Sequence, residues 1–187
     1  MAYEDPRWEL FLRRPWKCAA CDEEHRGLFH LSIEQPFHWD PLSPPLSADQ
    51  NTFLNQDMCV IEARDFFVRG VLEIPLIGAG NERFGYGVWT TLAEPNFRRY
   101  VDTYETHSQG SLGTWFGWFA NRLDGYPDTL NLKCNVRPRD DRQRPIIEVQ
   151  ASVDHPLARE QREGITYDRL MEILALHGHG PPAARHH

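Results

Sequence analysis

The sequence has no hydrophobic run long enough to cross a membrane and no excess of positive charge. A membrane helix needs roughly 20 apolar residues in succession, and no run in this chain approaches that length. The N-terminus also lacks the apolar segment of a secretory signal. The 187 residues carry 20 Lys and Arg against 27 Asp and Glu, a net charge of −7. We therefore expect a cytoplasmic protein with no membrane and no nucleic-acid partner, since nucleic acids and anionic membranes attract basic surfaces.

Cysteine is scarce, with four in the chain and only two of them close together. Small secreted domains that depend on disulfides are much richer in cysteine. A chain of this length also buries about 70% of its unfolded surface without such cross-links. The close pair, Cys18 and Cys21, therefore indicates a metal knuckle or a redox pair in a reducing compartment.

Motifs of several enzyme classes are missing as well. The chain has no Gly-x-Ser-x-Gly nucleophile elbow and no phosphate loop ending in Gly-Lys-Ser/Thr. Gly78-Ala79-Gly80 follows an apolar run, but no third glycine stands at the spacing of a dinucleotide-binding loop. These gaps favour a non-enzymatic protein over an enzyme.

The clearest structural signal is a pair of apolar runs, residues 66–74 and 84–92, separated by a Gly- and Asn-containing loop. Their alternation predicts a long antiparallel hairpin at the centre of a sheet. Side chains alternate across a strand, so Gly85 and Gly87 share one face. Their missing side chains leave space beside Trp89 for another backbone or a ring.

Shorter patterns predict the elements around this hairpin. Thr166 is placed to cap the last helix, with Ile165 and Leu170 at hydrophobic-staple spacing. The fold class that follows is α+β, with a mostly antiparallel sheet of about five to six strands, helices chiefly on one face and a small N-terminal Cys-x-x-Cys knuckle. The predicted helices are a short one within 1–15 that Pro15 ends, and 49–55, 94–105, 156–163 and 167–174. The predicted strands outside the hairpin are 28–33, 58–61, 115–119 (or a strand there followed by one helical turn), 130–136 and 146–149.

No internal repeat and no long linker divides the sequence. We expect an N-terminal arm, residues 1–50, that carries the knuckle and a Pro-rich loop and packs on an α+β domain of residues 51–176. Residues 177–187 are rich in Gly, Pro and His and are expected to form a mobile tail. His186 and His187 resemble the remnant of an expression tag, so we base no inference on them.

The sharpest chemical signal is Cys18-x-x-Cys21 with His25 four residues later. Zinc accepts a mixed set of thiolates and imidazole nitrogens, and a structural site uses four of them. Cys59 is the best distant fourth ligand, because a metal bound there would pin the N-terminal arm to the sheet. Cys134 lies on the apolar face of its strand and indicates a small buried hydrophobe. The alternatives to zinc are a redox pair and two cysteines without chemistry.

A second candidate site uses Arg69 and Glu73, which share one face of the predicted strand because they are four residues apart. With Trp89 across the hairpin they would line a polar cleft that binds a small anion. The simpler alternative is a cross-strand ion pair on a face covered by a helix.

Taken in order, these motifs resemble a bacterial family known as domain of unknown function 2199, over residues 16–174. The resemblance implies a single bacterial domain and no particular activity, and it makes Cys18, Cys21, His25 and Cys59 one cluster to test. It rests on Trp16-x-Cys18-x-x-Cys21-x-x-x-His25, Asp57-x-Cys59-x-Ile61, Phe67-Val68-Arg69-Gly70-Val71-Leu72-Glu73-Ile74-Pro75, Phe84-Gly85-x-Gly87-Val88-Trp89, Asn96-Phe97-x-Arg99-Tyr100, Tyr126-Pro127-x-Thr129-Leu130, Arg144-Pro145-x-Ile147-Glu148 and His155-Pro156-Leu157-Ala158.

Three functions are compatible with these observations. The first is a non-enzymatic protein that binds a protein or small-molecule partner, with zinc as a structural clip. The second is a hydrolase-like metal-dependent enzyme that uses the same cluster; a catalytic zinc needs an open coordination position and a nearby general base. The third is an immunity or antitoxin-type inhibitor, suggested by small size and acidity. The chain has no His-Glu-x-x-His helix, so we favour the first.

Overall fold

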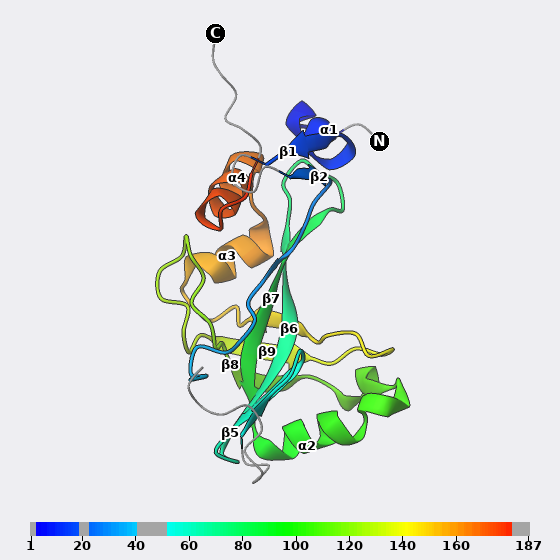
Figure 1. Cartoon of the computed structure of the whole chain (residues 1–187), viewed down its shortest axis with the longest axis vertical. Coiled ribbons are helices and arrows are strands. Elements are labelled where there is room, and N and C mark those ends of the chain that lie inside the picture. Colours follow the sequence, from blue (N-terminus) through cyan, green and yellow to red (C-terminus); the bar gives the residue numbers. More distant parts are fainter. Residues whose placement is uncertain (1–2, 19–22, 41–51, 181–187) are drawn as a thin grey trace.

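The structure is a computed structural model that describes residues 3–18, 23–40 and 52–180. This part of the chain has an α+β fold built around one long hairpin (Figure 1). In chain order the elements are α1 (Pro6–Arg13), β1 (Pro15–Lys17), β2 (Glu24–Arg26), β3 (Leu31–Ser32), β4 (Phe53–Leu54), β5 (Met58–Ile61), β6 (Asp65–Pro75), β7 (Arg83–Leu92), α2 (Glu94–Asp102), β8 (Trp115–Trp118), β9 (Lys133–Arg137), β10 (Ile146–Val149), α3 (Pro156–Glu163) and α4 (Tyr167–Leu176), with two short 3₁₀ turns between α2 and β8.

The predicted central hairpin is present as β6 and β7, which pair in antiparallel register from Phe66↔Leu92 to Pro75↔Arg83. One of its faces supplies fully buried apolar side chains, Val68, Leu72 and Ile74 among them, to the main core. The opposite face carries Phe67 and Trp89 into a second, smaller apolar cluster. Both faces of the hairpin are therefore covered along much of its length.

The glycines of β7 leave the room that the sequence predicts. A Cβ atom on Gly85 would lie 2.8 Å from Nδ1 of His30, and one on Gly87 would lie 2.6 Å from Oγ of Ser32. The short strand β3 fills this space, running parallel to β7 with Ser32 opposite Gly87. Glycine at these two positions lets the N-terminal part of the chain approach the hairpin backbone closely.

Among the residues that the structure describes, the main sheet has eight strands, and β1 and β2 form a separate two-stranded sheet. The prediction of five to six strands was too low. β3 lies within the strand predicted at 28–33, whereas β4 is two residues long and lies where a helix was predicted. The order is β3-β7-β6-β10-β9-β8, with β5 on β6 and β4 on β5. A bridge between Thr90 and Phe119 links the end of β8 back to β7. The strands β6 to β10 thus curl into a partly closed barrel.

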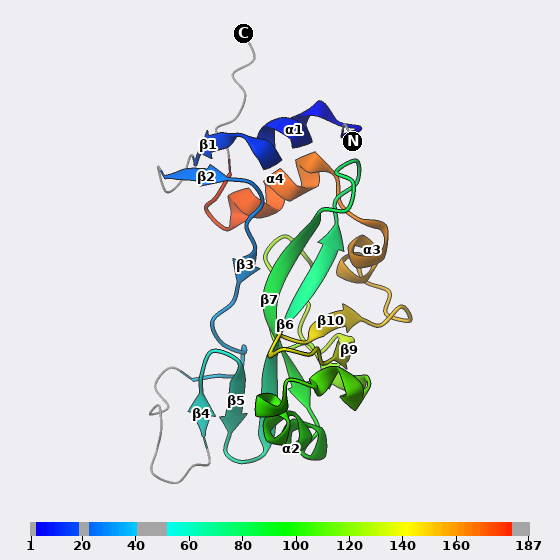
Figure 2. The same cartoon turned by 90° about the vertical axis from the view of Figure 1, so that its right-hand side faces the viewer.

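The helices are spread along the length of the hairpin, and the buried side chains of all four belong to the main core cluster on one of its faces, as predicted. Figure 2 shows α1 and α4 near the β6–β7 turn and α2 at the opposite end. Thr166 caps α4 as predicted, and its Oγ1 accepts a hydrogen bond from the N–H of Arg169. The helix predicted at 49–55 was wrong where it can be judged, since Phe53–Leu54 is strand β4; 49–51 lie outside the described residues.

One joint connects the hairpin to the C-terminal strands. β10 pairs in parallel with β6 through Ile146 and Val71 alone, and the N–H of Val71 donates to the carbonyl of Pro145 at 2.8 Å. Ile147 crosses directly over Gly70, where a Cβ would lie 2.5 Å from its Cδ1 atom. Beyond this joint β10 turns away from β6 (Figure 2). The two strands therefore diverge and leave their outer faces open between them.

No helix within the described ranges is long and apolar enough to span a membrane. Trp8 and Phe11 of α1 belong to the same core cluster as the hairpin. The far part of the Pro-rich loop, 41–51, and the tail from 181 onward lie outside the described residues, so the predictions made for them are not tested.

Candidate metal site and polar pocket

The N-terminal hairpin β1–β2 positions two of the predicted metal ligands. Trp16 pairs with His25, and the N–H of Cys18 donates to the carbonyl of Glu23 at 2.8 Å, which extends the ladder beyond β1. Cys18 is buried, with 1% of its surface exposed. A regular ladder therefore holds the thiol and the imidazole near one another. Cys21 lies outside the described residues, so the predicted knuckle is not shown.

The third member of the group is His179, which follows α4. The N–H of Gly178 donates to the carbonyl of Ala175, and that of His179 donates to the carbonyl of Leu174. Gly178 has φ +70°. This bond pattern with a left-handed residue is a Schellman motif, which ends helices and fixes the direction of the chain that leaves them. The helix terminus thus determines where the backbone of His179 lies.

Cys18, His25 and His179 each offer one ligand atom, and these atoms all lie within 4.8 Å of one another. The Sγ of Cys18 is 3.9 Å from Nδ1 of His179. Tetrahedral zinc with a Zn–S bond near 2.3 Å and a Zn–N bond near 2.05 Å places these two atoms about 3.6 Å apart. Small adjustments of the side chains would therefore bring the group to the geometry of a metal site.

Aromatic rings surround the two imidazoles. The ring centroid of His25 lies 4.9 Å from that of Trp16 and 5.3 Å from that of Phe29, and the centroid of His179 lies 5.1 Å from that of Phe29. The rings of the two histidines are 5.8 Å apart and nearly perpendicular. This packing restricts the orientation of both imidazoles.

The prediction that Cys59 completes this cluster is not supported. Cys59 lies in β5, where it pairs with Phe67 of β6, and it is buried in the same cluster as Trp89. The end of α4, which leads to His179, packs on a different part of the hairpin. There the rings of His177 and Tyr86 are 6.2 Å apart, and Tyr86 pairs with Leu72. The strand from Phe67 to Leu72 spans about 17 Å at ~3.3 Å per residue, far beyond metal–ligand reach.

Cys59 and Cys134 are both buried, and neither forms a disulfide. Burial raises the pKa of each thiol to about 12. Thiolates are the metal-binding and nucleophilic form of cysteine, so these two cysteines act as core residues. For Cys134 this confirms the prediction.

The predicted cleft of Arg69, Glu73 and Trp89 divides into two places. Arg69 is 3% exposed and donates to Glu34 at 3.0 Å and to the hydroxyl of Ser32. The indole N–H of Trp89 donates to the carbonyl of Ile33 at 3.0 Å. Both side chains therefore help to hold the β3 segment on the hairpin, and Glu73, four residues or about 13 Å further along β6, does not join them.

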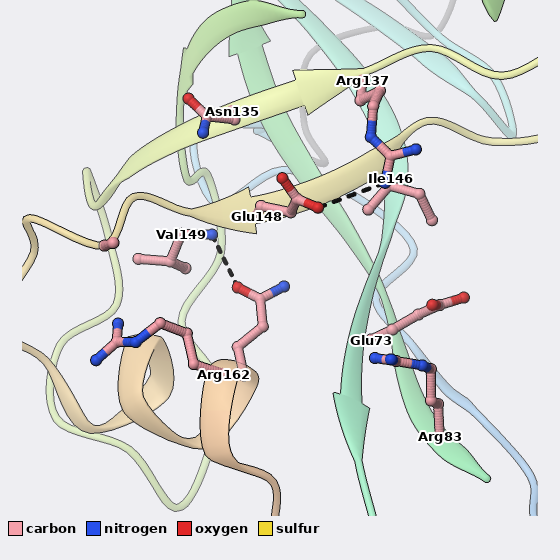
Figure 3. A pocket seen from close by; sticks show the side chains of 10 residues that line it. Glu73, Arg83, Asn135, Arg137, Ile146, Glu148, Val149 and Arg162 are labelled. Carbon is pink, nitrogen blue, oxygen red and sulfur yellow. Dashed lines mark hydrogen bonds and ion pairs between the residues drawn. The ribbon is translucent and has the colours of Figure 1, made fainter. Parts of the chain in front are cut away.

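Glu73 lines a pocket of about 510 Å³ instead. The pocket occupies the outer face of β9 and β10 where β6 diverges from them, and α3 forms one wall (Figure 3). Sequence alternation predicted a wet face for β9, and Asn135 and Arg137 lie on it. The pocket itself depends on how distant elements meet. Its polar residues are Glu73, Arg83, Asn135, Arg137, Glu148, Gln161 and Arg162.

Sequence reasoning missed His179, because the search for ligands followed the Cys-x-x-Cys motif and treated the C-terminal histidines as tail. Gly178, two residues after the last apolar residue of α4, was a usable signal. A glycine that ends a helix fixes the backbone direction of the residue after it.

Comparison with known proteins gives one family. A family profile described as an uncharacterized protein conserved in bacteria, DUF2199, matches residues 17–165. Searches of curated proteins and of solved structures found no match. The matched range includes β2, the central hairpin and all strands of the barrel, and it begins at the last residue of β1. The chain belongs to the DUF2199 family of bacterial proteins.

Proposed function

We propose that this protein is a non-enzymatic binding domain in which zinc clips the β1–β2 hairpin to the end of α4. The observation that carries the proposal is the convergence of Cys18, His25 and His179, since two of the three come from one end of the sequence and the third from the other. Residues that distant in sequence approach within ligand distance only through the tertiary fold.

The chemistry of the group fits zinc. One thiolate and two imidazole nitrogens are ligands that zinc accepts, and Cys21, three residues from Cys18, is the fourth ligand that the Cys-x-x-Cys spacing favours. With four protein ligands the coordination sphere is closed, as in structural sites. The buried thiol of Cys18 and the rings of Trp16 and Phe29 also leave little access for a substrate. A metal-dependent enzyme would instead keep one position open for water.

Metal analysis of the protein, purified without a His tag and with His186 and His187 removed, tests this proposal. We expect about one zinc per chain. Cys18→Ser and His179→Ala should each lose it, whereas Cys59→Ala and His107→Ala should retain it. Cys59 was the sequence-based candidate and His107 is an exposed histidine remote in sequence from the group, so these two variants control for loss of a thiol and of an imidazole.

Removal of the metal should also lower thermal stability. A ligand present at a thousand times its dissociation constant stabilises the folded state by about 4 kcal/mol, which for a chain of this size corresponds to roughly 8–16 °C in Tm. Cobalt substitution reports the ligand set through the thiolate-to-cobalt absorption band. A spectrum with one thiolate and bound water would contradict the closed clip and favour an enzyme, and absence of metal from every preparation would remove both.

A further inference from the structure

The pocket between β10 and α3 has a rigid floor. Gln161 of α3 accepts a hydrogen bond from the N–H of Val149 at 2.8 Å and donates one to the carbonyl of Ile147 at 2.8 Å. Beyond Ile146, β6 no longer pairs with β10. The carboxamide of Gln161 makes hydrogen bonds to β10 along that unpaired edge instead. Both ends of the amide are committed, so neither Gln161 nor this stretch of β10 has freedom to collapse into the pocket.

Arginines from three different elements line this pocket. Arg83 comes from β7, Arg137 from β9 and Arg162 from α3. Arg137 has one carboxylate partner, Glu148, at 3.4 Å. Arg83 and Arg162 have no carboxylate within 4.0 Å among the residues that the structure describes, and Arg162 donates one of its N–H groups to the carbonyl of Ala158 at 2.9 Å.

The lack of carboxylate partners at Arg83 and Arg162 among the described residues differs from what many other arginines of the chain show. The molecule carries a net charge of −7, and many of its other arginines pair with carboxylates, including Arg7, Arg64, Arg98, Arg144 and Arg169. Two guanidinium groups left without carboxylates at one concave site retain their capacity to bind an oxyanion. A guanidinium presents donors in a planar fork that matches a carboxylate or phosphate.

The wall that carries Arg83 also carries a carboxylate. Glu73 is half-buried, has no hydrogen-bond donor among the described residues, and lies on the wall with Arg83 (Figure 3). A carboxylate accepts hydrogen bonds only, so it suits a hydroxyl or ammonium group of a ligand. The volume of about 510 Å³ lies within the usual range for small-molecule sites, roughly 300–1,000 Å³.

We propose that this pocket binds a small molecule that carries carboxylate or phosphate groups, which contact Arg83 on one side and Arg162 on the other, and a hydroxyl or ammonium group that contacts Glu73. This inference rests on the binding role proposed above and is independent of the metal. It names the class of ligand and the residues that select it.

An NMR titration of the full chain tests the inference. The probes are inorganic phosphate, succinate and L-malate, with sodium chloride at matched ionic strength as the blank. The reporters are the backbone N–H of Val149 and the side-chain amide of Gln161, which form the floor. We expect saturable shifts at both reporters. Malate should bind more tightly than succinate, because its hydroxyl can donate to Glu73.

Variants then assign the binding to the pocket. Arg83→Gln and Arg162→Gln should each weaken binding at least tenfold. Arg159→Gln, on the same helix and exposed, removes the same charge outside the pocket and should change affinity less than twofold. Native amide dispersion in each variant establishes that it is folded. Glu73→Gln should reduce the preference for malate over succinate.

Two results would overturn the inference: no saturable shift at either reporter with any of the three probes, or equal weakening by Arg159→Gln and Arg162→Gln, which would indicate attraction by net charge alone. The metal-free His179→Ala protein separates this inference from the zinc clip. It should bind malate as the wild type does, and loss of binding in that variant would contradict the independence of the two sites.

Discussion

Gly70 is the position where a single added methyl group should separate β6 from β10. A Cβ at this residue would lie 2.5 Å from Cδ1 of Ile147 and 2.7 Å from the carbonyl oxygen of Pro145. Real Cβ atoms do not approach so closely, and the carbonyl belongs to backbone that cannot rotate away. We expect Gly70→Ala to push β10 from the hairpin.

The expected cost has two parts. Overpacking a well-filled core typically costs 1–3 kcal/mol. Displacement of Pro145 also loses the hydrogen bond from the N–H of Val71, worth about 1 kcal/mol. Gly70→Ala should therefore lower the free energy of unfolding by about 2–4 kcal/mol. Urea unfolding followed by tryptophan fluorescence measures it, with a shift of the midpoint at unchanged slope.

A double-mutant cycle identifies the cause. Ile147→Ala alone should cost about 2–5 kcal/mol, because the residue is fully buried. In the double variant the new methyl group occupies part of the vacated space. The stability lost in the double variant should therefore be smaller than the sum of the two single losses by about 1 kcal/mol or more. Gly80→Ala controls for the substitution itself: its Cβ meets nothing within 4 Å, and its φ of +69° predicts a cost near 1 kcal/mol. If Gly70→Ala costs no more than Gly80→Ala, or if the cycle is additive, the close approach at the joint is not what constrains this position.

Two further predictions concern local features. Thr166→Ala should lower the free energy of unfolding by about 1 kcal/mol in urea, because α4 loses the side-chain cap on the N–H of Arg169; no measurable loss would show that the cap is replaced by solvent. Cys59 and Cys134 should resist iodoacetamide at pH 8 in the native protein, as peptide mass spectrometry can show, because burial raises the pKa of both thiols to about 12. The same shift predicts that stability falls as pH rises from about 9 to 12, because the unfolded thiols lose their protons first. Buried tyrosines with raised pKa contribute to the same fall, so the Cys134→Ala variant is the control. A fall in the intact protein that is no steeper than in this variant would contradict the assignment to the thiol.

Local patterns predicted the elements whose burial repeats along the chain. The hairpin of β6 and β7 gave a signal over two long runs, because one face packs against the main core at alternate residues. The strands β9 and β10 and the helix α4 with its cap were predicted for the same reason. The two-residue strand β4 is too short to show a period, so the sequence did not mark it, whereas the apolar residues around β3 predicted a strand at 28–33.

The candidate site was predicted in part for a related reason. Cys18 and His25 are close in sequence and stayed together in the fold, across the β1–β2 ladder. The third ligand depends on which element lies beside the β1–β2 ladder. That element is the end of α4, which supplies His179, and not the central sheet, which carries Cys59. A chain position 154 residues from His25 reaches the group because a Schellman motif turns the backbone there.

Arg69 shows a different limit of pattern reasoning. Alternation correctly placed it with Glu73 and Trp89 on one face of the hairpin. It could not show that the Ser32 and Glu34 segment covers Arg69 and leaves Glu73 open to a pocket. The sequence left a polar cleft and a covered ion pair open for Arg69, and in the structure this guanidinium is buried against Trp89, with its carbon 5.9 Å from the ring centroid.

The long hairpin also explains why the two proposed sites can be tested separately. The metal group joins the β1–β2 hairpin to the end of α4, whereas the pocket depends on the β6–β10 joint and on α3. The Gly70 joint bears on the second set of contacts and on none of the bonds that hold Cys18, His25 and His179. A change at Gly70 should therefore disturb anion binding before it disturbs metal content, and a change at His179 should do the reverse. The order of these losses reports whether the hairpin carries two independent sites or one cooperative unit.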